Sequence, residues 1–78
     1  MLKLILIRAT DNSFIYHYFP EAKSVYGILS ISTATGEFEI IKVAENDAHR
    51  RYLGHAISEL RKFHKSSTYC KKSTVTWY

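Results

Sequence analysis

Histidines and basic side chains gather in one stretch of the chain, DAHRRYLGHAISELRKFHK, at residues 47–65. This stretch holds three of the four histidines and five of the eleven lysines and arginines. A row of cations releases counterions from a nucleic-acid backbone, whereas clustered histidines are typical of metal sites and of general acid–base catalysis. The stretch therefore indicates a nucleic-acid surface, a metal or catalytic centre, or only the solvent-exposed side of an amphipathic helix.

A helix over residues 47–65 separates these side chains into two faces when each residue advances by about 100°. The apolar face, which we expect to pack on the core, comprises Tyr52, Leu53, Ala56, Ile57, Leu60 and Phe63, with His49 and His64 in the same arc. The opposite, basic face is the candidate binding face and comprises Arg50, Arg51, Gly54, His55, Ser58, Arg61, Lys62 and Lys65. We expect nucleic acid on this face to be held by charge, without sequence preference. The alternative is a basic helix that only faces solvent.

The histidines do not converge on one site. The three in the helix are six and nine residues apart, whereas paired ligands on one helical face are about four apart. We expect His49 to be a partly buried histidine, and His64 with Cys70 supplies too few ligands for a metal. No spacing singles out His55 or Arg51 as part of a nuclease centre. We therefore expect no metal and no cofactor, with a small nuclease or toxin-like enzyme as the enzymatic alternative.

The chain of 78 residues is long enough for one domain, which we expect to span residues 1–78. Its only cysteine, Cys70, allows no internal disulfide, and this favours a reducing compartment, so we expect a cytoplasmic protein. The opening MLKLILI is too short to cross a bilayer and lacks a signal-peptide cleavage site, so we expect no membrane partner. Residues 46–78 carry seven cations and two acids, whereas residues 1–45 carry four cations and five acids.

The elements that position these residues are four strands, a helix and a short last strand. The predicted strands are LKLILIRA, FIYHYF, VYGILSIS and EFEIIKV, at residues 2–9, 14–19, 25–32 and 37–43. Gly36 suits the left-handed position of the loop before the fourth strand. Asn46 or Asp47 is expected to cap the helix, and TVTWY is expected to close the chain with Trp77 in the core. The pattern predicts an α+β fold, in which one long helix packs on one face of an antiparallel β-meander in the order β-β-β-β-α-β.

A single helix covers only one face of such a sheet. The other face would expose Ile5 and Ile7 with either the set Phe14, Tyr16 and Tyr18 or the set Ile15 and Phe19. An apolar patch of that size favours a two-fold homodimer. The sequence is therefore interpreted as a non-enzymatic binding module whose partner is a protein or a second copy of the chain. The alternative is a nucleic-acid-binding module that uses the basic helix face.

Four short motifs carry a resemblance to a known group. YFPE (18–21), TGE (35–37), YLGHA (52–56) and the terminal WY occur in this order. In this the chain resembles a group of short uncharacterised proteins from Gram-positive bacteria and their phages or mobile elements. The resemblance covers most of the chain and implies a small, stand-alone bacterial domain in the cytoplasm. It implies no particular activity, so no functional residue is carried over from it.

Overall fold

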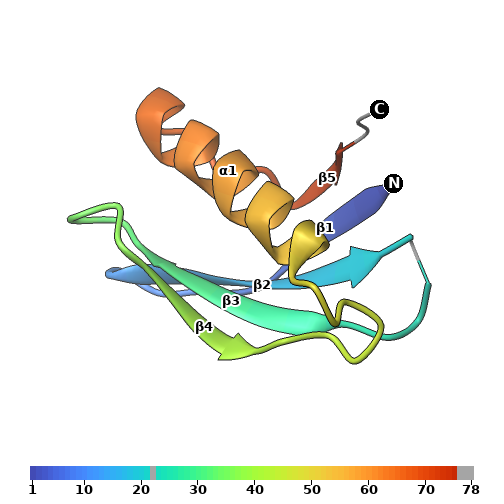
Figure 1. Cartoon of the computed structure of the whole chain (residues 1–78). Coiled ribbons are helices and arrows are strands. Elements are labelled where there is room, and N and C mark those ends of the chain that lie inside the picture. The colour runs from blue at the N-terminus through green and yellow to red at the C-terminus, as the bar shows by residue number, and fades with distance from the viewer. Residues whose placement is uncertain (22, 76–78) are drawn as a thin grey trace.

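The computed structural model describes residues 1–21 and 23–75. Within them the element order is β1 (Leu2–Ala9), β2 (Ser13–Pro20), β3 (Gly27–Ser32), β4 (Phe38–Lys42), α1 (Arg51–Ser66) and β5 (Lys72–Val75). The strands form one sheet in the order β4-β3-β2-β1-β5, and every neighbouring pair is antiparallel. The helix lies across one face of this sheet (Figure 1). The predicted α+β class and the order of the elements are confirmed.

Strand β1 lies inside the sheet, between β2 and β5, as its apolar side chains on both faces predict. Leu2 and Leu4 are fully buried beneath the helix. A β-bulge follows Leu6, because the pairing with β2 shifts between Leu6 and Arg8. The bulge places Arg8 opposite Ile15 and leaves Ile7 52% exposed. Arg8 therefore takes the position opposite Ile15 that Ile7 would occupy in a regular strand.

Strand β2 turns its large aromatic side chains toward the helix. Tyr16 and Tyr18 are fully buried, and both hydroxyl groups are hydrogen-bonded. The Tyr16 hydroxyl donates to the Cys70 carbonyl at 2.7 Å, and the Tyr18 hydroxyl accepts from the Ala44 N–H at 3.0 Å. Burial raises the pKa of both hydroxyl groups, so both stay protonated. The alternate set of β2, which includes Ile15 and Phe19, faces the other way.

Helix α1 begins four residues later than predicted, at Arg51. Arg50 takes the N-cap position in a left-handed conformation with φ 55° and makes no side-chain capping bond. Asp47 provides the cap instead, from a turn before the helix, as its position in the sequence predicts. His49 lies in that turn and is exposed, so the prediction of a partly buried His49 is wrong.

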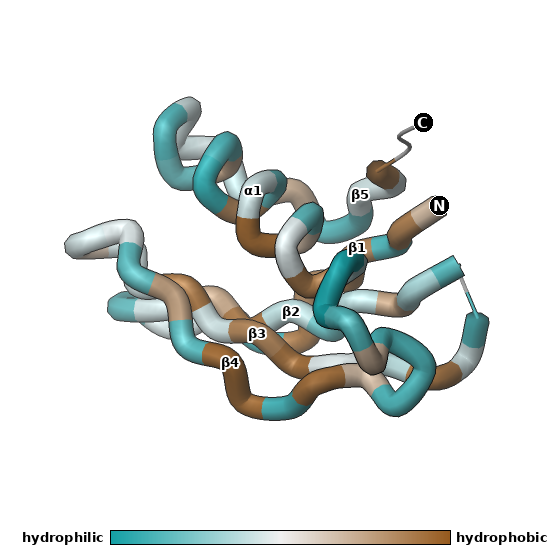
Figure 2. The backbone as a smooth tube through the Cα atoms, viewed as in Figure 1, coloured by the Kyte–Doolittle hydropathy of each residue, from teal (hydrophilic) through white to brown (hydrophobic). Residues whose placement is uncertain are grey.

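The helix has one side turned to the sheet and one side turned away. Its buried residues are Leu53, Ala56, Leu60 and Phe63, all from the predicted apolar face. Figure 2 shows hydrophobic positions on the lower side of α1, toward the sheet, and hydrophilic positions on the side turned away. No helix in the described part of the chain is long and apolar enough to cross a membrane.

The last strand starts two residues before its predicted position. Ser73 and Val75 of β5 lie opposite Leu4 and Leu2 of β1, which places β5 at one edge of the sheet. Lys72 and Ser73 precede the predicted strand TVTWY, and they become strand because the edge of β1 offers them a partner. Trp77 lies outside the described residues.

Candidate functional site

Part of the predicted basic helix face lines a hollow. Ser58, Arg61, Lys62 and Lys65 line a hollow of about 390 Å³ between α1 and the loop that joins β3 to β4. Its other lining residues are Thr35, Gly36 and His64, and we call this the hairpin–helix pocket. Four of the eight residues of the predicted basic helix face therefore line this pocket.

The remaining predicted residues lie toward the start of the helix. Arg51 borders a smaller hollow with residues of the 46–52 segment, and Arg50 is exposed at the N-cap. Gly54 is exposed, and a Cβ atom added to it would meet no atom within 4 Å. His55 is half-buried. These four residues are not among those that line the hairpin–helix pocket.

A second candidate surface is the sheet face that the helix leaves uncovered, which we call the open face. Paired residues in neighbouring strands point to the same side of a sheet, so the register identifies its members. Its central row runs across all five strands and comprises Lys42, Ile28, His17, Ile5 and Lys72. The rows on either side comprise Glu39, Ser30, Ile15 and Arg8, and Phe19, Lys3 and Thr74.

Three rings form a cluster on the open face. His17 and Tyr26 are stacked, with ring centroids 4.1 Å apart and planes at 9°. Phe19 lies 5.6 Å from Tyr26 and 6.3 Å from His17, measured between centroids. All three are half-buried. The Lys42 Nζ lies 4.8 Å from the Tyr26 ring centroid, a cation–π contact that holds a positive charge at the edge of the cluster.

The cluster changes the protonation of its histidine. Burial lowers the pKa of His17, and the positive charge of Lys42 lowers it further. The imidazole is therefore neutral at neutral pH, and the stacked pair with Tyr26 is uncharged. The cations of the open face surround this uncharged centre and do not interrupt it.

A hollow adjoins the ring cluster. It has a volume of about 270 Å³ and is lined by Lys3, Ile5, Phe19, Lys23 and Ser24. Its lining combines one aromatic and one aliphatic side chain with two cations and no acid. Such a combination suits a ligand with a flat apolar part and a negatively charged part.

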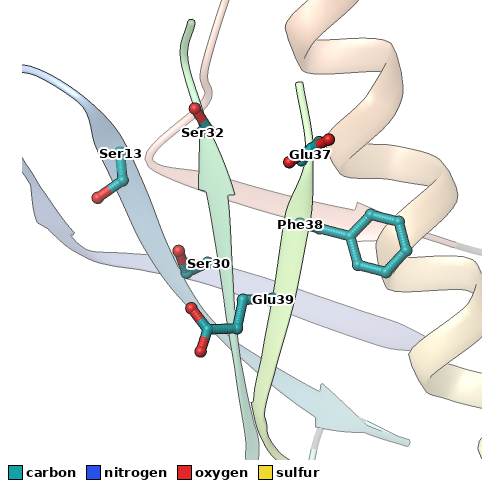
Figure 3. Close-up of a pocket in the computed structure, with 6 residues that line it drawn as sticks. All are labelled: Ser13, Ser30, Ser32, Glu37, Phe38 and Glu39. Atoms are coloured by element: carbon teal, nitrogen blue, oxygen red, sulfur yellow. The ribbon is translucent and has the colours of Figure 1, made fainter. Parts of the chain in front are cut away.

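The acids near the open face lie at its other end. Ser13, Ser30, Ser32, Glu37, Phe38 and Glu39 line a hollow of about 190 Å³ (Figure 3). The Phe38 ring points toward the helix, whereas the Glu39 side chain points away from it (Figure 3). The two carboxylates repel anions, so an anionic ligand is disfavoured in this hollow.

The described histidines lie in different parts of the molecule. His17 lies on the open face, His64 in the hairpin–helix pocket and His49 in the turn before α1. Within residues 1–21 and 23–75, no group of three or more His, Cys, Asp or Glu side chains is placed to hold a metal ion. Cys70 is an exposed free thiol.

No protein-family model matches the chain, and neither a curated protein nor a solved structure matches it significantly. The function is therefore argued from the surfaces of the molecule alone.

The sequence contained a partial signal for the open face. Alternation in FIYHYF places Ile15, His17 and Phe19 on one face of the strand and Phe14, Tyr16 and Tyr18 on the other. Because one helix covers only one face of the sheet, one of these two sets had to remain uncovered. The place of Lys42 comes from strand pairing across the sheet, and that of Tyr26 from its ring contact with His17; no local spacing in the sequence records either.

Proposed function

We propose that the protein is a non-enzymatic module that binds single-stranded nucleic acid on its open face. The observation that carries this proposal is the ring cluster of His17, Tyr26 and Phe19 with the Lys42 cation at its margin. The proposed setting is the cytoplasm, because the cysteine at position 70 is free and exposed.

Unpaired bases are the ligands that such a surface favours. Every base has a π-face, and stacking on an aromatic side chain contributes about 1–3 kcal/mol per base. Bases in a duplex are already stacked on one another and cannot offer that face. Lys3, Lys23 and Lys42 would contact the phosphates that follow the stacked bases. Phe19 lines the adjoining hollow and is the side chain best placed to receive a base there.

A second candidate function is self-association through the same face. Ile5, Ile15 and Ile28 are half-buried at its centre and would be covered in a two-fold dimer. Charge opposes this arrangement. The paired rows of the open face contain four cations (Lys3, Arg8, Lys42 and Lys72) but one acid, Glu39. Two such faces brought together would oppose like charges, whereas a polyanion would neutralise them.

The experiment is a fluorescence anisotropy titration of a labelled single-stranded oligonucleotide and of a duplex of equal length. We expect the single strand to bind more tightly than the duplex. Phe19→Ala should weaken binding by the loss of one stacking contact, and Lys3→Gln should lower the slope of log K against log salt by about 0.7. Arg51→Gln is the matched control, since it removes one charge from the helix side.

Other results of these experiments would indicate a different function. Equal affinity for the duplex, lost in Arg51→Gln and retained in Phe19→Ala, would move the nucleic-acid site to the basic helix face. Absence of oligonucleotide binding, with a dimer in sedimentation that Ile28→Glu dissociates, would favour self-association. Association with an acidic protein that nucleic acid does not displace would indicate a protein partner.

A further inference from the structure

We infer that the hairpin–helix pocket is a second site, which binds a small phosphate-bearing molecule independently of the open face. The pocket lies on the helix side of the sheet, and its lining comes from two segments distant in sequence. Three of its lining residues are cations (Arg61, Lys62 and Lys65), and none is an acid. A concave surface with one sign of charge concentrates ligands of the opposite sign.

Gly36 lets the loop approach the helix closely. A Cβ atom at this position would lie 2.7 Å from the Cδ2 atom and 2.8 Å from the Nε2 atom of His64. The backbone of Gly36 also has φ +78°, which side chains other than glycine rarely allow. The loop and the imidazole edge are therefore in contact, and together they form one wall of the pocket.

The His64 ring is held from its other side by Tyr69. The Nδ1 atom of His64 lies 2.8 Å from the Tyr69 hydroxyl. Burial raises the pKa of Tyr69, so the hydroxyl keeps its proton and can donate it to Nδ1. In that arrangement Nε2 carries the ring hydrogen on the edge that faces Gly36. The ring then presents an N–H donor beside the three cations.

Arg61 is held in place by an aromatic ring. Its guanidinium carbon lies 5.1 Å from the centroid of the Phe38 ring, which is a cation–π contact. In the described part of the chain, the ion pair found joins the Met1 amino group to Glu21, far from this pocket in the sequence. The Phe38 ring therefore positions the positive charge of Arg61, and no acid among the described residues is found to neutralise it.

The donors of the pocket match a phosphate group. A guanidinium binds two phosphate oxygens at once, lysines add point charges, and the Ser58 and Thr35 hydroxyls can donate as well. The volume of about 390 Å³ is in the range of small-molecule sites, so it can hold more than a single phosphate. The helix C-terminus attracts cations, which accounts for Lys65 in the last turn. This attraction does not account for the contact of Arg61 with the Phe38 ring of β4, or for the pocket wall formed by Gly36.

The test is a calorimetric titration with inorganic pyrophosphate at about 0.15 M salt, combined with amide NMR shifts. We expect saturable binding at one site, with shifts at Gly36 and Ser58. Arg61→Gln should weaken binding by about ten-fold or more, because it removes a bidentate charged contact. Arg51→Gln is the matched control, since it removes the same charge from the other end of the same helix and should leave binding unchanged.

Three results would overturn the inference. These are the absence of saturable binding, an equal loss of affinity in Arg51→Gln and Arg61→Gln, and shifts confined to the open face. A thermal melt of each variant keeps loss of folding separate from loss of the site. Phe38→Leu provides a second variant, which keeps an apolar residue but removes the ring under Arg61, and a smaller loss is expected. Phe19→Ala should weaken oligonucleotide binding and leave pyrophosphate binding intact, so that the two proposals succeed or fail separately.

Discussion

The Asp47 carboxylate caps helix α1 at Leu53, six residues away, by accepting the Leu53 backbone N–H at 2.9 Å. Its other oxygen accepts the N–H of Tyr52 at 3.1 Å. Asp47 is 3% exposed, so neither donor finds water as an easy substitute. The turn before the helix is therefore folded around this carboxylate.

Asp47→Ala should lower the free energy of unfolding by about 1–3 kcal/mol, because it leaves two helix N–H groups without their acceptor in a buried place. Urea denaturation followed by circular dichroism measures the change. Asn46→Ala is the control, since Asn46 is exposed in the same turn and its replacement should change stability by less than about 0.5 kcal/mol. Equal midpoints for the two variants would show that the carboxylate is not the cap in solution.

The glycines at positions 27 and 54 should respond in opposite directions to alanine. A Cβ atom at Gly27 would lie 2.1 Å from Cε1 of Tyr18 and 2.7 Å from the Lys42 carbonyl oxygen, so Gly27→Ala must displace a core ring or a strand. Gly54→Ala meets nothing within 4 Å and should stabilise the helix by up to about 1 kcal/mol. Thermal melts of both variants test this pair. A Gly27→Ala variant as stable as the parent protein would contradict the close packing of Tyr18.

Removal of the Tyr18 hydroxyl and of the Tyr16 hydroxyl should lower the free energy of unfolding by different amounts. Tyr18→Phe leaves the N–H of Ala44 without its partner at a residue that is 2% exposed, and we expect a loss of about 1–3 kcal/mol. Tyr16→Phe removes a donor to the carbonyl of Cys70, which is exposed and can bind water instead, so the expected loss is about 1 kcal/mol or less. Denaturant midpoints rank the two variants. The reverse order would show that the Ala44 amide has another acceptor.

Stability should fall as the pH drops below the ordinary histidine value of 6.5. The pKa of His17 in the folded protein lies below that value, so the unfolded chain binds more protons in the interval between the two. The contribution of His17 is complete above pH 6.5 and is lost as the pH falls toward the folded pKa. The charged group beside the ring cluster of His17 is Lys42. The residues opposite His17 in β3 and β1 are Ile28 and Ile5.

Unfolding free energies at about pH 7 and about pH 5, for the parent protein and for His17→Gln, measure this dependence. The variant should lose less stability than the parent protein between the two pH values. Histidines 49, 55 and 64 are common to both proteins, so the difference between the two proteins reports on His17. An identical pH dependence would mean that His17 is not shielded from water.

Local patterns in the sequence determined the elements of this protein. The aliphatic run LKLILI, the alternation in FIYHYF, the apolar stripe with Leu53 and Leu60, and Gly36 in its loop were enough to predict strands, helix and hairpin. These signals work because strands and helices impose their periods on any chain that must bury one face. The central position of β1 followed for the same reason, since its side chains are apolar on both sides.

Tertiary structure alone decided which faces carry the candidate sites. Both sets of β2 are apolar enough to face a helix, and Tyr16 and Tyr18 take that side where their hydroxyls find Cys70 and Ala44. That choice leaves His17 on the open face, where strand pairing brings Lys42 and Lys72 into its row. The helix start depends in the same way on the burial of Asp47, and the hairpin–helix pocket on contact between segments far apart in the chain. Such contacts follow from the packing of the whole sheet, and no local period encodes them.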